Sequence, residues 1–366
     1  MNSARASAIA LNYQAGAARA ENSPVRRLQV RPIAESRDAW QQFLTNAPQA
    51  SLYHGFEWQQ VLSTAYSLRF EVAILEKGRT PIAGCLLARC RNPLSHRLIA
   101  LPFTDYCPPL ALGDDGSTAI LLRELASRRT AGAGVEIRGI SAEPPWRTSD
   151  CFSHWTMDLG RPFSTIDKSM DRNFKRQVRR ANEAELTVTA GSSLAHAKRF
   201  YALHLETRQR LGLPAPPWRF FRLVQETFAA SGRFEVYLAT LGERDVAGVV
   251  LLKDGSRLHC KWSARSAAPP TGATHLLFWN VCRRYAEELD TFDLGRTDFR
   301  NEGLARFKRE LGAIASPLPY AFYPKIPSQV SAEHTTGFAN IVTRLWRRLP
   351  APVTRTLGAA LYGYLS

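Results

Sequence analysis

The sequence lacks the residue patterns that usually bind metals or form disulfide frameworks. Its six cysteines show neither a C-x-x-C pair nor framework spacing, so we expect reduced, partly buried thiols. The eight histidines form no ligand pattern, since His196 and His204 stand eight residues apart, which is not a zinc spacing. We therefore expect neither a metal nor a tightly bound cofactor.

Long apolar runs are also lacking. Residues 1–27 are rich in Ala, Ser, Asn and Arg without a continuous apolar run, which predicts a flexible leader rather than a signal peptide or anchor. No later stretch contains about 18 uncharged apolar residues, the length that spans a bilayer. We expect a cytoplasmic protein.

Acidic residues are scarce relative to basic ones. The chain has 48 Lys and Arg against 32 Asp and Glu, a formal net charge of +16 over 366 residues. Such a chain attracts polyanions, for example RNA, nucleotide pyrophosphates or an anionic membrane. The alternative is a solubility bias without a specific partner. The length favours two domains.

One segment occurs twice, 164 positions apart. The tetrapeptide 69–72 returns as 233–236, and without a gap Gly78 then aligns with Gly242 and Gly84 with Gly248. Each copy predicts a hairpin with a Gly turn, preceded by an aromatic-rich helix and followed by strand, helix and strand. Two unrelated hairpins are the alternative; we favour a duplicated α/β module, with a cleft where the copies meet.

The first copy contains no catalytic constellation. We expect strands over 28–33, 98–103 and 135–140, helices over 38–44, 56–66 and 117–130, and the hairpin over 70–90. Asp105 and Tyr106 follow the third strand; they either line the cleft or serve as turn residues. The segment 155–159 is expected to cross to the second copy.

The second copy opens with a basic helix, expected from residue 168. Met170, Phe174, Val178 and Ala181 share one face, and the arginines occupy another. A solvated basic face is the alternative, but five cations within nine residues favour phosphate contact. These arginines are Arg172, Arg176, Arg179 and Arg180.

Further polar residues follow along this half. A helix over 194–211 contains Glu206 and Arg208, where Glu206 could simply pair with Arg210. A strand over 257–263 contains Lys261 and Trp262. Exposed N–H groups at the start of the next helix can hold a phosphate. That start follows Arg265 and comprises Thr271, Gly272 and Ala273.

Four marks in this half together resemble the FemAB-like branch of the GNAT (N-acetyltransferase) superfamily, most closely its exopolysaccharide- and envelope-associated subgroup. They are the basic helix 172–180, the stretch 206–212 before a Pro-rich turn, the segment 292–296 (Phe-Asp-Leu-Gly-Arg) and the segment 307–312, which begins Phe-Lys and ends in Gly. The resemblance covers about residues 30–325.

This resemblance implies an α/β (α+β) fold of two tandem GNAT-like modules, each a mixed, mostly antiparallel sheet flanked by helices. We place the modules at 28–160 and 161–325. The implied reaction is N-acyl transfer to an amine of an envelope or exopolysaccharide precursor. The donor is acyl-CoA or, in the peptidoglycan-bridge branch, aminoacyl-tRNA. The reaction needs an oriented, deprotonated amine and stabilisation of the tetrahedral oxyanion, but no covalent enzyme intermediate.

The resemblance also suggests roles. Lys308 would stabilise negative charge, Asp293 would orient a neighbour or accept the amine proton, and Arg296 would bind an anionic group. Alternatively, Asp293 caps a turn and Lys308 is solvated. The candidate substrate-binding residues are Arg172, Arg176, Arg179, Arg180, Glu206, Arg208, Lys261 and Trp262; those for the donor are Arg265, Thr271, Gly272 and Ala273.

One departure keeps the alternatives open. The usual CoA loop reads R/Q-x-x-G-x-G/A, and here Arg265 is followed by Ala268 where the first Gly would be. Aminoacyl-tRNA-dependent transfer onto a peptidoglycan precursor therefore remains an alternative, as does a non-catalytic RNA- or membrane-binding scaffold. An occluded cleft would favour the scaffold.

The tail, 326–366, contains no acidic residue beyond 333. Apolar residues at helical spacing over 338–349 and 353–364 oppose several arginines. This pattern predicts a basic amphipathic helix pair on the inner face of the cytoplasmic membrane. Packing against the globular body is the alternative.

Overall fold

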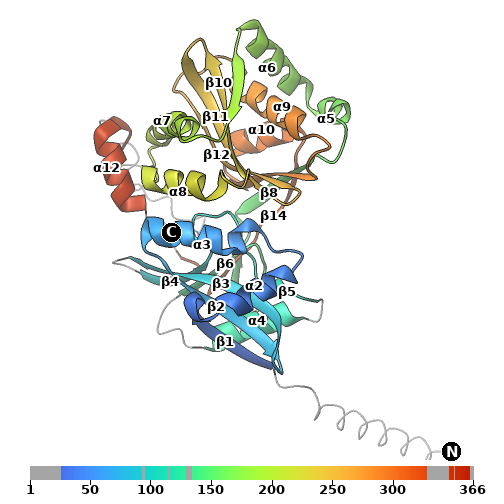
Figure 1. The fold of residues 1–366 in the computed structure, drawn as a ribbon, viewed down its shortest axis with the longest axis vertical. Coiled ribbons are helices and arrows are strands. Elements are labelled where there is room, and N and C mark those ends of the chain that lie inside the picture. The colour runs from blue at the N-terminus through green and yellow to red at the C-terminus, as the bar shows by residue number, and fades with distance from the viewer. Residues whose placement is uncertain are drawn as a thin grey trace, which may run out of the picture.

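The computed structural model describes residues 26–92, 95–113, 116–128, 134–327, 346–349 and 351–362. Within them the chain forms two sheets, each flanked by helices, in two stacked bodies (Figure 1). Nearly all of the expected leader, and the expected tail helix over 338–349 up to residue 345, lie outside the described residues. The predicted fold class, two tandem GNAT-like modules of mixed α/β structure, is confirmed.

The first sheet has the order β1-β2-β3-β4-β6-β15-β7, with β5 paired to β3. Most neighbours are antiparallel, but β4 and β6 run parallel because helix α4 connects them. The strands are β1 (Arg26–Pro32), β2 (Arg69–Lys77), β3 (Thr80–Asn92), β4 (Ser95–Ala100), β5 (Leu110–Ala111), β6 (Gly134–Arg138), β7 (Arg147–Ser149) and β15 (Tyr320–Tyr323); the helices are α2 (Arg37–Thr45), α3 (Phe56–Tyr66) and α4 (Ser117–Ser127).

The second sheet has the order β14-β8-β13-β12-β11-β10-β9. Its one parallel pair, β12 with β13, is again connected by a helix, α9. The strands are β8 (Phe152–Asp158), β9 (Thr187–Gly191), β10 (Phe234–Leu241), β11 (Arg244–Asp254), β12 (Arg257–Arg265), β13 (Thr291–Asp298) and β14 (Ile314–Pro317). The helices are α5 (Phe163–Ser169), α6 (Arg172–Glu183), α7 (Leu194–Leu211), α8 (Trp218–Phe228), α9 (Ala273–Tyr285) and α10 (Glu302–Leu311).

The sequence repeat corresponds to equivalent elements in the two bodies. Hairpin β2–β3 matches β10–β11, and each turn contains a glycine with positive φ, Gly78 at 69° and Gly242 at 56°. The preceding helices, α3 and α8, pack against each other across the boundary, with the rings of Trp58 and Phe220 6.0 Å apart. The duplicated module predicted from the repeat is thus present, and its two copies share an apolar interface.

Two strands join the bodies by crossing between them. Strand β8 follows the first module in the chain but pairs with β13 in the second sheet, which confirms the crossing expected for 155–159. Strand β15 follows the second module but pairs between β6 and β7 in the first. Because β15 lies beyond the last strand of the second sheet, the chain returns to the first body after it has completed the second, and this return ties the two bodies together.

The basic segment forms two helices, not the single helix expected from residue 168. Helix α5 ends at Ser169, Met170 is extended, and the Asp171 carboxylate caps α6 by accepting from the Asn173 N–H at 2.6 Å. Asp favours the N-cap because its side chain satisfies a free N–H of the first turn. Met170, Phe174, Val178 and Ala181 are buried as predicted.

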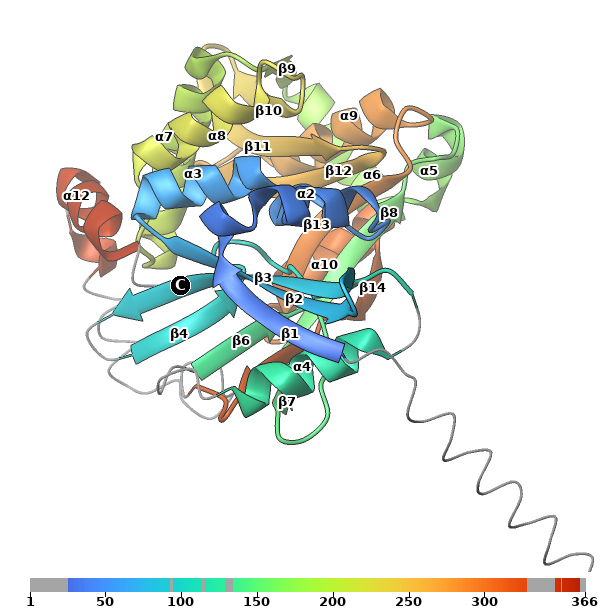
Figure 2. The ribbon, with the colours of Figure 1, turned by 60° about the horizontal axis from the view of Figure 1, so that its bottom comes forward.

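Helix α12 (Ala351–Tyr362) lies at the edge of the molecule (Figure 2) and contacts α7. A β-carbon on Gly358 would lie 2.9 Å from the Ala215 nitrogen, so the helix meets the Pro-rich turn after α7 at close range. This described part of the tail therefore packs against the body, as the alternative describes, and membrane binding of the tail stays a prediction. No helix among the described residues is long and apolar enough to cross a membrane.

Candidate active site

The two central parallel strands of the second module separate partway along their length. Strands β12 and β13 pair only from Arg257 opposite Thr291 to His259 opposite Asp293. Beyond that point the pairing of β12 with β11 is irregular, at Val250 and Leu251 of β11. The pairing of β13 with β8 is also irregular, between Asp293 and Arg296. A V-shaped opening results, lined by backbone that a neighbouring strand no longer covers.

A cavity of about 760 Å³ occupies this opening. It is bounded by the ends of β12 and β13, the N-terminus of α9, helix α10 and the end of α7. Eight of the residues that the sequence predicted to bind substrate or donor, or to act in catalysis, line this cavity. They are Lys261, Trp262, Arg265, Thr271, Gly272, Ala273, Arg296 and Lys308.

Lys261 is the extra residue of the bulge in β12, because Val250 pairs with Trp262 while Leu251 pairs with Cys260. Bulges commonly redirect a side chain beside an active site. Its Nζ donates to the Phe103 carbonyl at 2.7 Å and lies 5.0 Å from the Tyr53 ring centre and 4.6 Å from that of Trp58. Burial lowers the pKa of Lys261 to about 8, although Asp105 and Asp293 act in the opposite direction.

Lys308 approaches the same cavity from α10. Only 5% of the residue is exposed, and its Nζ donates to the carbonyls of Gly295 and Arg296 at 3.0 and 3.1 Å. Burial lowers the pKa of this amine to about 8 as well. The alternative of a solvated lysine is therefore wrong, and two amines with lowered pKa flank one cavity.

Asp293 lies beneath the cavity and accepts hydrogen bonds from four groups. Tyr106 Oη and His154 Nε2 each donate at 2.7 Å, His259 Nδ1 at 3.1 Å and the Gly295 N–H at 2.8 Å. Burial would raise the pKa of Asp293, but the two histidines hold it well below its usual range. Such a carboxylate orients its neighbours; with its lone pairs engaged and its pKa low, it is a poor proton acceptor.

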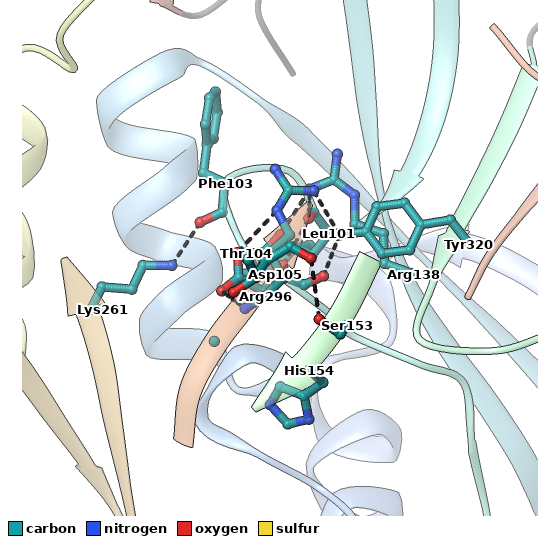
Figure 3. A network of polar contacts seen from close by, with 12 residues as sticks. Leu101, Phe103, Thr104, Asp105, Arg138, Ser153, His154, Lys261, Arg296 and Tyr320 are labelled. Carbon is teal, nitrogen blue, oxygen red and sulfur yellow. Dashed lines mark hydrogen bonds and ion pairs between the residues drawn. The ribbon is translucent and has the colours of Figure 1, made fainter. Parts of the chain in front are cut away.

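Arg296 and Asp105 join the two modules at the edge of the cavity (Figure 3). Asp105 Oδ2 accepts from the Arg296 N–H at 3.0 Å, and Asp105 Oδ1 lies 3.4 Å from Arg296 Nε. Burial raises the pKa of the Asp105 carboxyl, but the nearby Arg296 and Lys261 lower it by more, so the net shift is downward. The Arg296 guanidinium also packs 4.6 Å from the centre of the Phe152 ring.

A loop of the first module supplies part of this site. Arg138, at the end of β6, donates to the carbonyls of Leu101 and Thr104 at 3.1 and 2.9 Å and pairs with Glu136 (Figure 3). These bonds hold the loop after β4, so that Asp105 lines the cavity and Tyr106 reaches Asp293. The first module therefore contributes residues to the site of the second.

The N-terminus of α9 forms one end of the cavity. Gly272 precedes the helix with a φ of 85°, and a β-carbon there would overlap the Gln177 carbonyl of α6. The N–H groups of a first helical turn have no partner within the helix, and of these the Ala273 N–H donates to the Pro270 carbonyl at 3.3 Å. Together with Arg265 and Arg210 on the lining, this helix start makes the end of the cavity suitable for an anionic group. The helix start predicted at Thr271–Ala273 is confirmed.

Other predicted binding residues lie outside the cavity lining. Arg172, Arg176, Arg179 and Arg180 are exposed on α6, and Glu206 is exposed on α7. Arg208 instead donates from Nε to the Pro214 carbonyl at 2.8 Å and lies 5.9 Å from the centre of the Tyr362 ring. For Arg208 this geometry indicates a role in holding the Pro-rich turn and α12, where sequence reasoning suggested substrate binding.

Sequence reasoning also missed several residues. Tyr53, His154 and His259 are not predicted as site residues. For Asp105 and Tyr106 the sequence does not decide between lining the cleft and serving as turn residues. The three side-chain partners of Asp293 are separated from it by between 34 and 187 positions, so no local pattern connects them. A usable signal was that the loop of Asp105 and Tyr106 follows the third strand, as the loop of Arg265 does in the second copy. The described residues contain no group of His, Cys, Asp or Glu that could hold a metal.

Comparison with known families agrees with this arrangement. Residues 168–309 match the model of the acetyltransferase (GNAT) domain, a segment that includes β12, α9, β13 and most of α10. No curated protein sequence matches the chain.

Several solved structures share the fold of both modules. FemX matches with a TM-score of 0.57 at 13% identity, covering 78% of this chain and 95% of its own. The C-terminal domain of a putative lysylphosphatidylglycerol synthetase from Agrobacterium fabrum gives 0.53 at 14%, with 81% and 94% covered. A tandem GNAT protein from the clavulanic acid biosynthesis pathway gives 0.51 at 14%, with 82% and 100% covered. The resemblance to FemAB-like tandem GNAT proteins is thus confirmed, by the domain match and by the fold.

Proposed function

Residues 168–309 form a GNAT acetyltransferase domain within a FemAB-like tandem fold, and on this premise we propose that the protein is an N-acyltransferase acting on an amine of a cell-envelope or exopolysaccharide precursor. The observation that carries the proposal is the cavity between the separated ends of β12 and β13. One end has an anion-binding helix N-terminus, and two amines flank its interior. The non-catalytic scaffold, for which an occluded cleft would have argued, is disfavoured by this volume.

The chemistry needs an oriented amine, an activated acyl group and a way to stabilise the tetrahedral oxyanion. We assign oxyanion stabilisation to Lys308, whose Nζ is fixed by two carbonyls and has one N–H left to donate. Asp105, ionised and facing the cavity, binds and orients the acceptor amine. The amine nitrogen forms the new amide bond while the donor's acyl–sulfur or acyl–oxygen bond breaks, and the amine proton leaves with the departing group or to solvent.

Asp293 serves the site indirectly. Its four hydrogen bonds fix Tyr106, His154 and His259 around the base of the opening, where β12 and β13 separate. Arg296 holds Asp105 in place from the second module. We infer that these two residues position the acceptor side of the cavity and do not exchange protons with substrate.

The donor is acyl-CoA or aminoacyl-tRNA. The phosphate end of either would meet the N-terminus of α9, with Thr271, Gly272 and Ala273, and the side chain of Arg265. A specific observation keeps tRNA as a second candidate. The four exposed arginines of α6 lie outside the cavity lining, yet α6 packs beside the start of α9, where the Gln177 carbonyl lies against Gly272. Only a donor much larger than CoA would extend onto that helix.

Parallel binding measurements with acetyl-CoA and charged tRNA, at one fixed physiological salt concentration, test the proposal. Fixed salt is needed because a strongly basic chain binds any RNA at low ionic strength. A CoA enzyme loses affinity on Arg265→Ala and retains it on Arg176→Ala/Arg179→Ala, while a tRNA enzyme loses affinity in both and prefers charged over uncharged tRNA. Arg244→Ala, an exposed arginine outside the cavity lining, is the matched control. Binding of neither donor would overturn the proposal.

The acceptor and the cellular location are further parts of the proposal. An envelope precursor is built on the cytoplasmic face of the membrane, where the basic chain and its tail would be attracted to anionic lipid. Sedimentation of the full chain and of a chain ending at residue 333 with anionic liposomes checks this part. Equal binding of the two chains would exclude a role of the tail.

A further inference from the structure

Phe103 has a backbone conformation that needs external support. Its φ is 59°, in the left-handed region that a bulky side chain adopts only under constraint. The ring contacts Tyr66 at a centroid distance of 4.5 Å and an interplanar angle of 29°. It also stacks on Tyr362, at 5.2 Å and 18°. One of its two stacked partners therefore comes from the C-terminal helix, 259 positions along the chain.

The orientation of Phe103 matters because its carbonyl binds Lys261. The 2.7 Å bond from Lys261 Nζ depends on where that carbonyl points, and the carbonyl direction depends on the backbone dihedrals of Phe103. If Phe103 relaxed to a negative φ, the carbonyl would turn away from the cavity. The lysine of the β12 bulge would then lose its fixed partner.

Helix α12 is held so that Tyr362 reaches this position. Thr354, Gly358 and Tyr362 recur every four residues and so share one face, on which Thr354 and Gly358 are buried. The absence of a β-carbon on Gly358 allows close approach to Ala215. Gln209 Nε2 donates to the Leu349 carbonyl at 2.8 Å, and the Arg208 guanidinium lies 5.9 Å from the Tyr362 ring centre. These contacts connect the end of α7 to the tail.

We propose that Tyr362 is a positioning residue that keeps Phe103 in its left-handed conformation and, through the Phe103 carbonyl, fixes the Lys261 ammonium at the cavity. The catalytic consequence rests on the proposed function, whereas the effect on Lys261 itself does not. The proposal also assigns a structural role to Arg208, whose guanidinium lies beside the Tyr362 ring and orients it against Phe103.

The charged surroundings of Lys261 do not include α12. Asp105 from the loop after β4, Asp293 and Arg296 from β13, and Arg138 from β6 act on its ammonium, and the Tyr53 ring lies beside it. Tyr362 acts on Lys261 only by geometry and by excluding water. Its hydroxyl lies in the field of Arg208, Arg296 and Asp105, with its pKa raised mainly by burial.

The test measures the pH dependence of lysine acetylation by acetic anhydride in the full chain, resolved for each lysine by mass spectrometry. Lys308 is the internal control, because its pKa is also about 8 and its carbonyl partners belong to β13. Tyr362→Ala should admit water to the Lys261 ammonium, and this relief of burial, the main cause of its low pKa, should outweigh the loss of the Phe103 carbonyl. The midpoint for Lys261 should therefore rise by about one pH unit, toward the value of a solvated lysine, and that of Lys308 should not change. Tyr362→Phe, which keeps the ring, should behave as the parent protein.

Gly358→Leu provides a second variant, since it displaces α12 while keeping Tyr362. It should shift the Lys261 midpoint in the same direction, and Tyr362→Ala should add nothing in a Phe103→Ala background. An unchanged Lys261 midpoint in Tyr362→Ala, or equal shifts at both lysines, would overturn the inference. Because the labelling needs no donor, its result is independent of whether the acyltransfer proposal holds; once a donor is found, Tyr362→Ala should lower kcat more than it raises KM.

Discussion

The carboxylate of Asp105, from the first module, lies against the α-carbon of Gly295 in the second, where a β-carbon would overlap Oδ2. Gly295 has a φ of 69° in the bulge of β13, and the next residue, Arg296, donates its N–H to the same carboxylate oxygen. The two modules thus meet at the cavity through a contact that only glycine permits.

Gly295→Ala should therefore separate the modules locally. We expect the free energy of unfolding to fall by about 2–3 kcal/mol, from the positive φ and the overlap together, and Asp105 to be displaced from the cavity. Urea denaturation measures the first effect. Gly242→Ala is the matched control, because that φ is 56° but a β-carbon would meet nothing within 4 Å, and it should cost only about 1 kcal/mol. Equal losses in the two variants would mean that the Asp105 contact is unimportant.

Lys308→Ala should reduce turnover by about 100-fold or more, because the variant loses the N–H assigned to the oxyanion. The carbonyls of Gly295 and Arg296 would lose a donor, at a cost of about 1–3 kcal/mol in stability. Steady-state kinetics and thermal unfolding, with exposed Lys198→Ala as control, separate the two effects. If the protein unfolds while residual activity per folded molecule is normal, Lys308 is structural.

Asp293→Asn should change how stability depends on pH. Burial lowers the pKa of His259, but Asp254 and Asp293 raise it above 6.5 overall. A raised pKa contributes stability that is complete below about pH 6.5 and lost as the pH rises through the folded-state pKa. In the Asn variant this loss should shrink, so the melting temperature should fall less between pH 6.5 and 9 than in the parent chain. Lys261 and Lys308 titrate in the same window with the opposite sign, and Asp293 raises the pKa of both. Without its charge both pKa values fall further, which changes the pH dependence in the same direction as the His259 effect. Parallel melting curves for the two chains would contradict this coupling.

Gly272→Ala should weaken donor binding. Its β-carbon would overlap the Gln177 carbonyl and push the start of α9 away from α6, which disorders the N–H groups assigned to the donor phosphate. We expect at least a tenfold loss of donor affinity, measured by calorimetry. Gly255→Ala, with a φ of 58° and open space around it, carries a similar backbone cost without the overlap and should bind normally. If Gly272→Ala binds the donor normally, the donor does not bind at this end of the cavity.

Local patterns in the sequence determined a large part of the architecture. The 164-residue repeat predicted two equivalent hairpins, helix 56–66 has the predicted bounds, and Gly312 ends α10 with a φ of 99°. Such features depend on side-chain periodicity and on glycine, which act over a few residues. Several residues of the cavity lining could be predicted for the same reason, since each lies in a short sequence motif. They are Lys261, Arg265, Gly272 and Lys308.

Only the tertiary structure decided which of these residues work together. The cluster on Asp293 joins Tyr106, His154 and His259 to a residue 34 to 187 positions away. The bulge that aims Lys261 and the return of β15 to the first sheet likewise depend on strand pairing. Burial likewise decided the state of Lys308, which is not the solvated lysine of the alternative interpretation but an amine with a pKa of about 8. The sequence by itself determined the two modules and the residue types of the site; their contacts and charge states depend on desolvation and long-range packing, which no local pattern encodes.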